Sequence, residues 1–168
     1  TPLHQVPGGE RAFIVTSASK SWNLAGLKAG LIIPGAEVAD VVTGLSGYVP
    51  ESASYLGVVA HATALTDGRD WLAEASAEIR ENKQHFADEL HHAIPELTYT
   101  PSQGTYLAWL DCSPLGLDHA GQHFFEKAKV RFGQGTDYAP SATQFVRVNL
   151  ATSKEIISEA VHRMAASL

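Results

Sequence analysis

A long run of helical periodicity occupies the middle of the chain, from Asp70 to about Ala93. Its apolar residues recur at the spacing of one helix face, and its charged residues are expected to lie elsewhere on the helix surface. The apolar set is Leu72, Ala75, Ile79, Phe86 and Leu90, and the charged set is Glu78, Arg80, Lys83 and Asp88. Pro95 ends the pattern, because proline cannot continue a helix. An amphipathic helix of this length needs a second layer to cover its apolar face.

The segments that follow this helix supply such a layer, because β-rich runs alternate there with helical patterns. The elements expected are strands at 97–100, 105–111 and 144–150, a helix capped by Asp118 that runs to about Lys129, a Gly-rich loop at 133–140, and an amphipathic helix capped by Ser153. The second part of the chain, residues 70–168, is therefore predicted to form a compact α/β unit.

The first part of the chain, residues 1–69, holds fewer elements and does not complete a sheet. Short apolar runs at 12–16 and 29–33 have the length of buried strands, and their short connection predicts that the two strands are adjacent. A modest helix is predicted at 37–45. An alanine-rich helix at 52–66 is apolar on most sides, which suits burial in a larger body.

Charge and composition exclude several classes of function. Lys and Arg total 12 against 18 Asp and Glu, a net charge of −6 without a cationic run, so nucleic acid is not expected as a partner. No window approaches the roughly 18 apolar residues of a membrane span, and the signal-peptide pattern is absent, so we expect no membrane association and a cytoplasmic location. Cys112 is the only cysteine, and His119 and His123 lack the glutamate of a zinc-protease motif, so no metal is expected. Because the chain opens at Thr1 and its one methionine is Met164, we expect a piece of a longer protein.

Lys20 lies among small polar residues directly after the first predicted strand. A lysine at the end of a buried strand can lose its charge by desolvation and act as an amine nucleophile toward a carbonyl. The hydroxyls of Ser17 and Ser19, with nearby backbone amides, could hold a phosphate beside it. The alternative is an ordinary surface turn with a solvated lysine, which composition alone does not exclude.

The segment 17–30, SASKSWNLAGLKAG, resembles the lysine motif of fold-type I pyridoxal 5'-phosphate (PLP) enzymes of the class I and II aminotransferase superfamily. Small residues flank Ser19-Lys20, and a Gly-containing turn leads to a basic residue before a small pair. The run Trp-Asn-Leu-Ala-Gly at 22–26 is similar to the cystathionine β-lyase branch, the carbon-sulfur lyases related to MalY and PatB. Lys28 departs from the pattern, because most aminotransferases carry an arginine there that binds the cofactor phosphate bidentately.

Two later segments resemble the same family in the same order. GTYLAWLD at 104–111 is similar to the strand that opens the central sheet of the small domain. FVRVNLA at 145–151 is similar to the strand whose arginine binds the substrate carboxylate, which implies this role for Arg147. Without the resemblance, Arg147 is interpreted as a surface arginine on a strand.

The resemblance implies an α/β chain of the PLP-dependent transferase fold type I, with residues 1–69 as the C-terminal part of the large PLP-binding domain and residues 70–168 as the small C-terminal domain. It implies that Lys20 holds PLP through its amine and then acts as a general base, and that Ser17, Ser19 and Lys28 contribute to cofactor binding. Arg147 would bind an amino-acid substrate through its α-carboxylate.

The implied function is that of a fragment of a PLP-dependent β-carbon-sulfur lyase, which cleaves cystathionine or related cysteine thioethers to a thiol, pyruvate and ammonia. An aminotransferase of class I/II is one alternative, and a non-catalytic domain that retains the fold is another. The resemblance also implies a homodimer with active sites shared between subunits. The family's glycine-rich phosphate loop, the aromatic residue stacked on the cofactor and the aspartate at its pyridine nitrogen have no counterpart in this chain, so the fragment alone is expected to bind PLP poorly and to be inactive.

Overall fold

The computed structural model describes residues 3–168, and the chain divides into two compact units, one ending at Glu74 and the other beginning at Ala75. The boundary falls inside α4, the helix Arg69–Ala93. The observation of α4 confirms the helix predicted from periodicity. Each unit has its own sheet. Within residues 3–168, no helix combines the length and apolar character needed to cross a membrane. The predicted domain division at residues 69 and 70 concerns the whole protein and stays a prediction.

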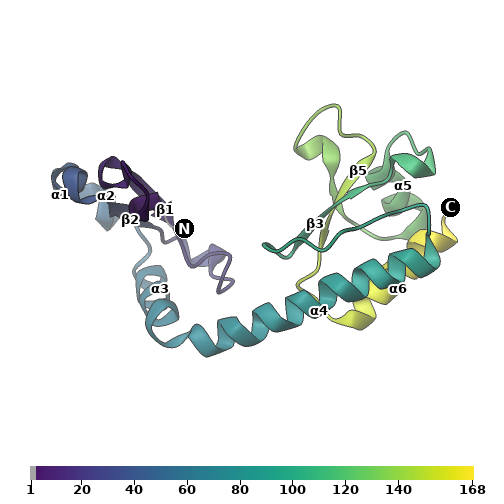
Figure 1. Cartoon of the computed structure of the whole chain (residues 1–168), viewed down its shortest axis with the longest axis horizontal. Coiled ribbons are helices and arrows are strands. Elements are labelled where there is room, and N and C mark those ends of the chain that lie inside the picture. The colour runs from purple at the N-terminus through teal and green to yellow at the C-terminus, as the bar shows by residue number, and fades with distance from the viewer. Residues whose placement is uncertain (1–2) are drawn as a thin grey trace. The chain divides into compact units, whose positions relative to one another are not determined.

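The first unit contains an antiparallel pair of strands, β1 (Phe13–Thr16) and β2 (Leu31–Pro34), followed by three helices (Figure 1). The helices are α1 (Ala39–Thr43), α2 (Tyr48–Glu51) and α3 (Tyr55–Asp67). The predicted adjacency of the two strands is confirmed, with Thr16 opposite Leu31. The predicted burial of the two strands is wrong for this chain, since Val15 is 77% exposed. Tyr55 at the start of α3 is 80% exposed in this chain, and the expected burial of this helix in a larger body stays a prediction. Within residues 3–168, β1 and β2 pair only with each other, so the outer edge of each strand has no partner strand.

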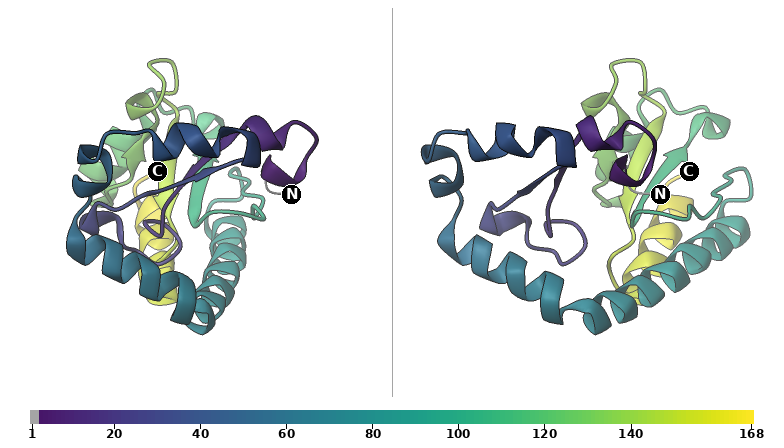
Figure 2. Two further views of the ribbon diagram at one scale, coloured as in Figure 1. Left: turned by 90° about the vertical axis from the view of Figure 1, so that its left-hand side faces the viewer. Right: turned by 60° about the vertical axis from the view of Figure 1, so that its left-hand side comes forward.

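The second unit is built on a three-stranded antiparallel sheet in the order β3-β5-β4. The strands of this sheet are β3 (Leu107–Asp111), β4 (Gly133–Gln134) and β5 (Phe145–Asn149). The unit also contains the helices α5 (Ala120–His123) and α6 (Lys154–Ala166). Helix α6 runs alongside the C-terminal part of α4 in both views of Figure 2, and a 2.8 Å hydrogen bond joins His85 Nε2 to Ser158 Oγ across the two helices. The predicted cap of α6 is confirmed, because Ser153 Oγ accepts from the Ile156 amide.

The core of the second unit lies between one face of the sheet and the two long helices. Strand residues alternate between the two faces of a sheet, so every second residue of β3 and β5 enters this core. The core includes Ala108 and Leu110 of β3, Val146 and Val148 of β5, Phe86 and Leu90 of α4, and Val161 and Met164 of α6. The same alternation places Trp109 and Arg147 on the other face of the sheet.

Three local predictions are wrong in the second unit. Residues 97–100 form no strand; the segment is bracketed by Pro95 and Pro101, which remove two backbone donors. Asp118 is not the cap of the next helix, which begins at Ala120, continues as a π-helical turn over Phe124–Ala128 and ends at the left-handed Lys129. The loop predicted at 133–140 begins with β4, because Gly133 and Gln134 pair with β5.

The position predicted for Lys83 on α4 is also wrong. Lys83 was expected on the charged surface of the helix, yet it is 3% exposed. It follows Ile79 by four residues and precedes Phe86 by three, so it occupies the apolar face of the same helix. Lys83 donates hydrogen bonds to the carbonyl groups of Ser102 and Gly104, which are distant in sequence. The local sequence pattern therefore could not predict these contacts.

Candidate active site

Lys20 lies in a closed turn directly after β1. The Trp22 amide donates to the Ala18 carbonyl at 3.0 Å, which closes the turn around Ser19 and Lys20. Within the turn, Ser17 Oγ accepts from the Ser19 amide at 3.3 Å and donates to Ser19 Oγ at 2.6 Å. The turn therefore has a fixed backbone, while Lys20 itself is exposed, and no carboxylate of residues 3–168 pairs with it.

Two hydrogen bonds join this turn to α3 and to the residue that ends it. The Ala18 amide donates to His61 Nε2 at 3.0 Å, and the Trp22 indole donates to the Gly68 carbonyl at the end of α3 at 2.8 Å. His61, Ala64 and Gly68 share one helix face with Gly57, because they follow it by 4, 7 and 11 residues. The residues of that face are small or form hydrogen bonds to the turn.

The close approach of α3 to the turn and to the segment that follows it requires glycine at two positions. A Cβ atom on Gly57 would lie 2.2 Å from the Leu27 carbonyl oxygen, and one on Gly68 would lie 2.6 Å from the Trp22 indole nitrogen. Lys28 follows the short helix Ala25–Leu27 and has a left-handed backbone with φ 54°. Lys28 is exposed in the same unit as Lys20, and within residues 3–168 no hydrogen bond joins it to Ser17 or Ser19.

Arg147 belongs to the second unit and lies in an aromatic setting on the outer face of the sheet. In the β ladder it stands opposite Trp109 on one side and Gly133 on the other. Its guanidinium carbon lies 4.8 Å from the centre of the Tyr138 ring, a cation-π contact. Trp109 meets Tyr138 edge-on at 5.4 Å and stacks on Phe145 at 5.7 Å. No carboxylate of residues 3–168 pairs with Arg147, so its fork can receive an external anion.

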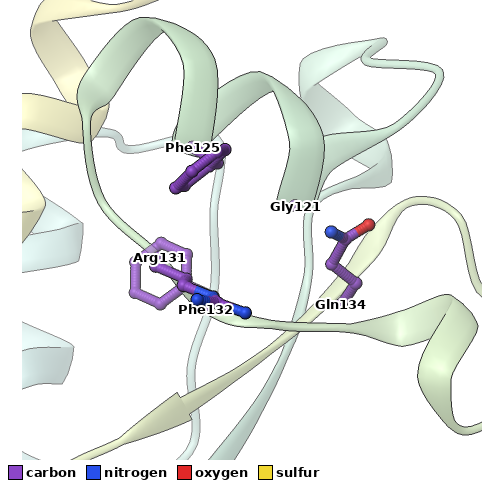
Figure 3. A pocket seen from close by; sticks show the side chains of 5 residues that line it. All are labelled: Gly121, Phe125, Arg131, Phe132 and Gln134. Atoms are coloured by element: carbon purple, nitrogen blue, oxygen red, sulfur yellow. The ribbon is translucent and has the colours of Figure 1, made fainter.

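The second unit contains a hollow without predicted site residues and another that includes Arg147. This hollow, of about 240 Å³, extends from Arg147 past Leu107 and Asn149 toward Ile156 of α6. The other, of about 200 Å³, is shown in Figure 3 and is lined by Gly121, Phe125, Arg131, Phe132 and Gln134. It contains none of the predicted site residues. Within residues 3–168, no cluster of three or more His, Cys, Asp or Glu could hold a metal ion.

The donor groups of the turn suit a phosphate-bearing aldehyde. Lys20 offers a primary amine that is not held by a carboxylate, and amines of this kind combine with carbonyl compounds. Because Ser17 Oγ donates to Ser19 Oγ, the hydrogen of the Ser19 hydroxyl is free to donate to another oxygen. The residues present therefore fit the amine and hydroxyl side of a PLP site.

The fold is that of the PLP-dependent proteins of fold type I, and comparison with known proteins supports this fold class. Residues 3–164 match the family "Aminotransferase class I and II", and the chain belongs to this family. The predicted family and fold class are thereby confirmed. A solved structure from Corynebacterium diphtheriae, assigned in its description as a PLP-dependent β-cystathionase, superposes with a TM-score of 0.86 at 36% identity and covers 92% of this chain and 42% of that chain.

Two curated relatives point to the same branch. The chain is 38% identical to a Mycobacterium tuberculosis protein whose name assigns it to the cystathionine β-lyases, covering 100% of this chain and 46% of that protein. It is 32% identical to the protein MalY of Escherichia coli, covering 95% of this chain and 42% of that protein. The chain thus spans less than half the length of these relatives.

Two residues that contact the candidate site were not predicted from the sequence. His61 contacts the turn at Ala18, and Tyr138 contacts Arg147. His61 sits in a helix whose other inward residues are small, and the spacing from Gly57 to Ala64 is the signal that could have revealed it. Tyr138 comes from a short helical turn after β4, and no local pattern places it over the Arg147 side chain.

Proposed function

We propose that the protein containing this chain is a PLP-dependent β-carbon-sulfur lyase that converts cystathionine or a related cysteine thioether, with water, to a thiol, pyruvate and ammonia. The observation that carries the proposal is the match, over the whole chain, to a relative named as a cystathionine β-lyase. The geometry supports it, because the motif lysine lies in a turn fixed by α3 with its amine unpaired in residues 3–168. A cytoplasmic homodimer with shared active sites is part of this proposal.

The roles of this chain's residues follow from their chemistry. Bound PLP supplies an electron-withdrawing ring that makes the substrate α-proton acidic. Lys20 holds the cofactor through Nζ, and once the substrate amine has displaced it, the same nitrogen takes the α-proton as a general base. Ser19, through its free hydroxyl hydrogen, and Lys28, through its positive charge, would help to hold the cofactor phosphate.

Arg147 fixes the orientation of the substrate. Its guanidinium has five donors in a planar fork that matches the two oxygens of an α-carboxylate. The Tyr138 ring, 4.8 Å away, restricts the guanidinium on one side. Holding the carboxylate fixes the direction of the α-C–H bond, which must point toward the base for proton removal.

The first test locates the amine. The full-length protein is incubated with PLP, reduced with borohydride and digested, and the labelled peptide is identified. Label on Lys20, lost in Lys20→Ala and kept in Lys28→Ala, is expected. Label on another lysine, or none, contradicts an enzymatic role for Lys20 and favours a non-catalytic domain.

The second test separates a lyase from an aminotransferase. The full-length protein is supplied with cystathionine and PLP in the absence of a keto acid, and pyruvate is measured over time. Steady pyruvate release is the expected result, because β-elimination needs no amino acceptor. Turnover that begins only when a keto acid is added identifies an aminotransferase instead.

A further inference from the structure

A buried hydrogen bond between Ala18 and His61 links the lysine turn to α3. Ala18 is 1% exposed and His61 is 8% exposed, so neither group of this bond has ready access to water. The bond joins residues 43 positions apart in sequence, with the amide nitrogen 3.0 Å from Nε2. It lies two residues before Lys20 in the chain.

The bond defines the state of the imidazole. A ring nitrogen that accepts a hydrogen bond from an amide carries no proton, so Nε2 is bare and the neutral ring has its proton on Nδ1. Within residues 3–168, the Ala18 amide has no other acceptor. Removal of the imidazole would leave a buried backbone donor unsatisfied, which is more costly than the loss of an exposed bond.

We propose that His61 is a positioning residue for Lys20, acting through the Ala18 amide; this inference rests on the proposed function. Lys20 has a long flexible side chain, so the place of its amine depends on the backbone that carries it. His61 fixes that backbone at Ala18, and the Trp22 amide bonded to the Ala18 carbonyl closes the turn on the other side of Lys20. Catalysis by an amine requires its nitrogen to be held close to the reacting carbon.

The variants that test this role are His61→Leu, which removes the acceptor, and His61→Gln, whose amide oxygen can replace Nε2. His91→Leu is the matched control, because His91 is an exposed histidine of the second unit and undergoes the same chemical change. His61→Ala serves in place of His61→Leu where the leucine variant does not fold. All are made in the full-length protein.

The first readout is independent of the cofactor: amide hydrogen exchange at Ala18 in the cofactor-free protein. We expect about tenfold faster exchange in His61→Leu, since a lost hydrogen bond of this kind corresponds to about one order of magnitude in an equilibrium constant. His61→Gln and His91→Leu should exchange at nearly the wild-type rate. Equal exchange in wild type and His61→Leu overturns the inference.

The second readout follows the amine itself, through the rate of borohydride-trapped PLP label on Lys20 and the kcat for cystathionine. Both should fall severalfold in His61→Leu with little change in KM, and His61→Gln should restore them. Wild-type trapping and kcat in His61→Leu overturn the positioning role alone. Absence of label on Lys20 in the wild-type protein overturns the proposed function, and the positioning role with it.

Discussion

The ammonium group of Lys83 donates a hydrogen bond to the backbone carbonyl of Gly104 at 3.0 Å from within the core of the second unit. A second bond, 2.9 Å long, reaches the carbonyl of Ser102. No carboxylate of residues 3–168 pairs with Lys83. A buried charge is costly unless hydrogen bonds replace its hydration, and here two carbonyl groups do so. Lys83 thereby ties α4 to the segment that leads into β3.

Replacing Lys83 with methionine should lower the free energy of unfolding by about 1–3 kcal/mol, because methionine fills the space but removes the donor of the Ser102 carbonyl and one of the two donors of the Gly104 carbonyl. Urea denaturation of the full-length protein measures the change. Lys154→Met is the matched control, because Lys154 forms an exposed ion pair with Glu81 and its loss should change stability little. An equal effect of the two substitutions contradicts a structural role for the buried lysine.

A methyl group on Gly57 should disturb the support of the lysine turn. The added Cβ would lie 2.2 Å from the Leu27 carbonyl oxygen, so α3 and the segment that follows the turn must move apart. Gly57→Ala is expected to cost about 1–3 kcal/mol of stability and to weaken PLP retention in the full-length protein. Gly47→Ala is the control, since a Cβ there meets nothing within 4 Å. Unchanged stability and PLP retention in Gly57→Ala would show that the turn does not depend on this contact.

Cys112 should be unreactive in the folded protein. Burial, with a smaller contribution from the charge of Asp111, raises the pKa of its thiol from 9.0 to about 12. Thiols react as thiolates, so alkylation of Cys112 at pH 8, followed by peptide mapping, should be slow in the native protein and fast in denaturing urea. Rapid alkylation under native conditions contradicts the burial.

The same shift gives a pH dependence of stability. Between pH 9 and pH 12 the unfolded chain loses the Cys112 proton while the folded chain keeps it, so the free energy of unfolding should fall as pH rises through this range. Cys112→Ala should reduce that slope in denaturation measurements made at several alkaline pH values. An unchanged slope would assign the alkaline loss of stability to other groups.

Local sequence patterns predicted those elements that depend on contacts between residues close together in the sequence. The periodicity of α4 and the Ser153 cap of α6 are contained within a few turns of chain, and both are observed. The burial of Lys83 and the contact of His61 with Ala18 depend on partners distant in sequence, which periodicity cannot show.

In the candidate site, too, residues close together in the sequence were predictable and contacts between distant segments were not. The motif around Lys20 identified the amine and its hydroxyl neighbours, because they are contiguous in sequence and form one turn. The helix that supports the turn, and the aromatic ring beside Arg147, come from other elements and required the structure. The roles of the predicted site residues stay predictions.

Arg147 should determine the affinity for the substrate carboxylate in the full-length protein. Its loss in Arg147→Ala removes a charge-assisted pair of about 1.5–3 kcal/mol, which corresponds to an increase of KM for cystathionine of about tenfold to a hundredfold. Arg147→Lys keeps the charge but not the planar fork, so an intermediate increase is expected. Tyr138→Leu, which removes the ring 4.8 Å from the guanidinium carbon, should raise KM by a smaller factor. Arg80→Ala is the control, because Arg80 is an exposed arginine of α4 in the same unit and does not line the hollow that includes Arg147. Steady-state kinetics with wild-type KM in Arg147→Ala would remove this residue from the substrate site.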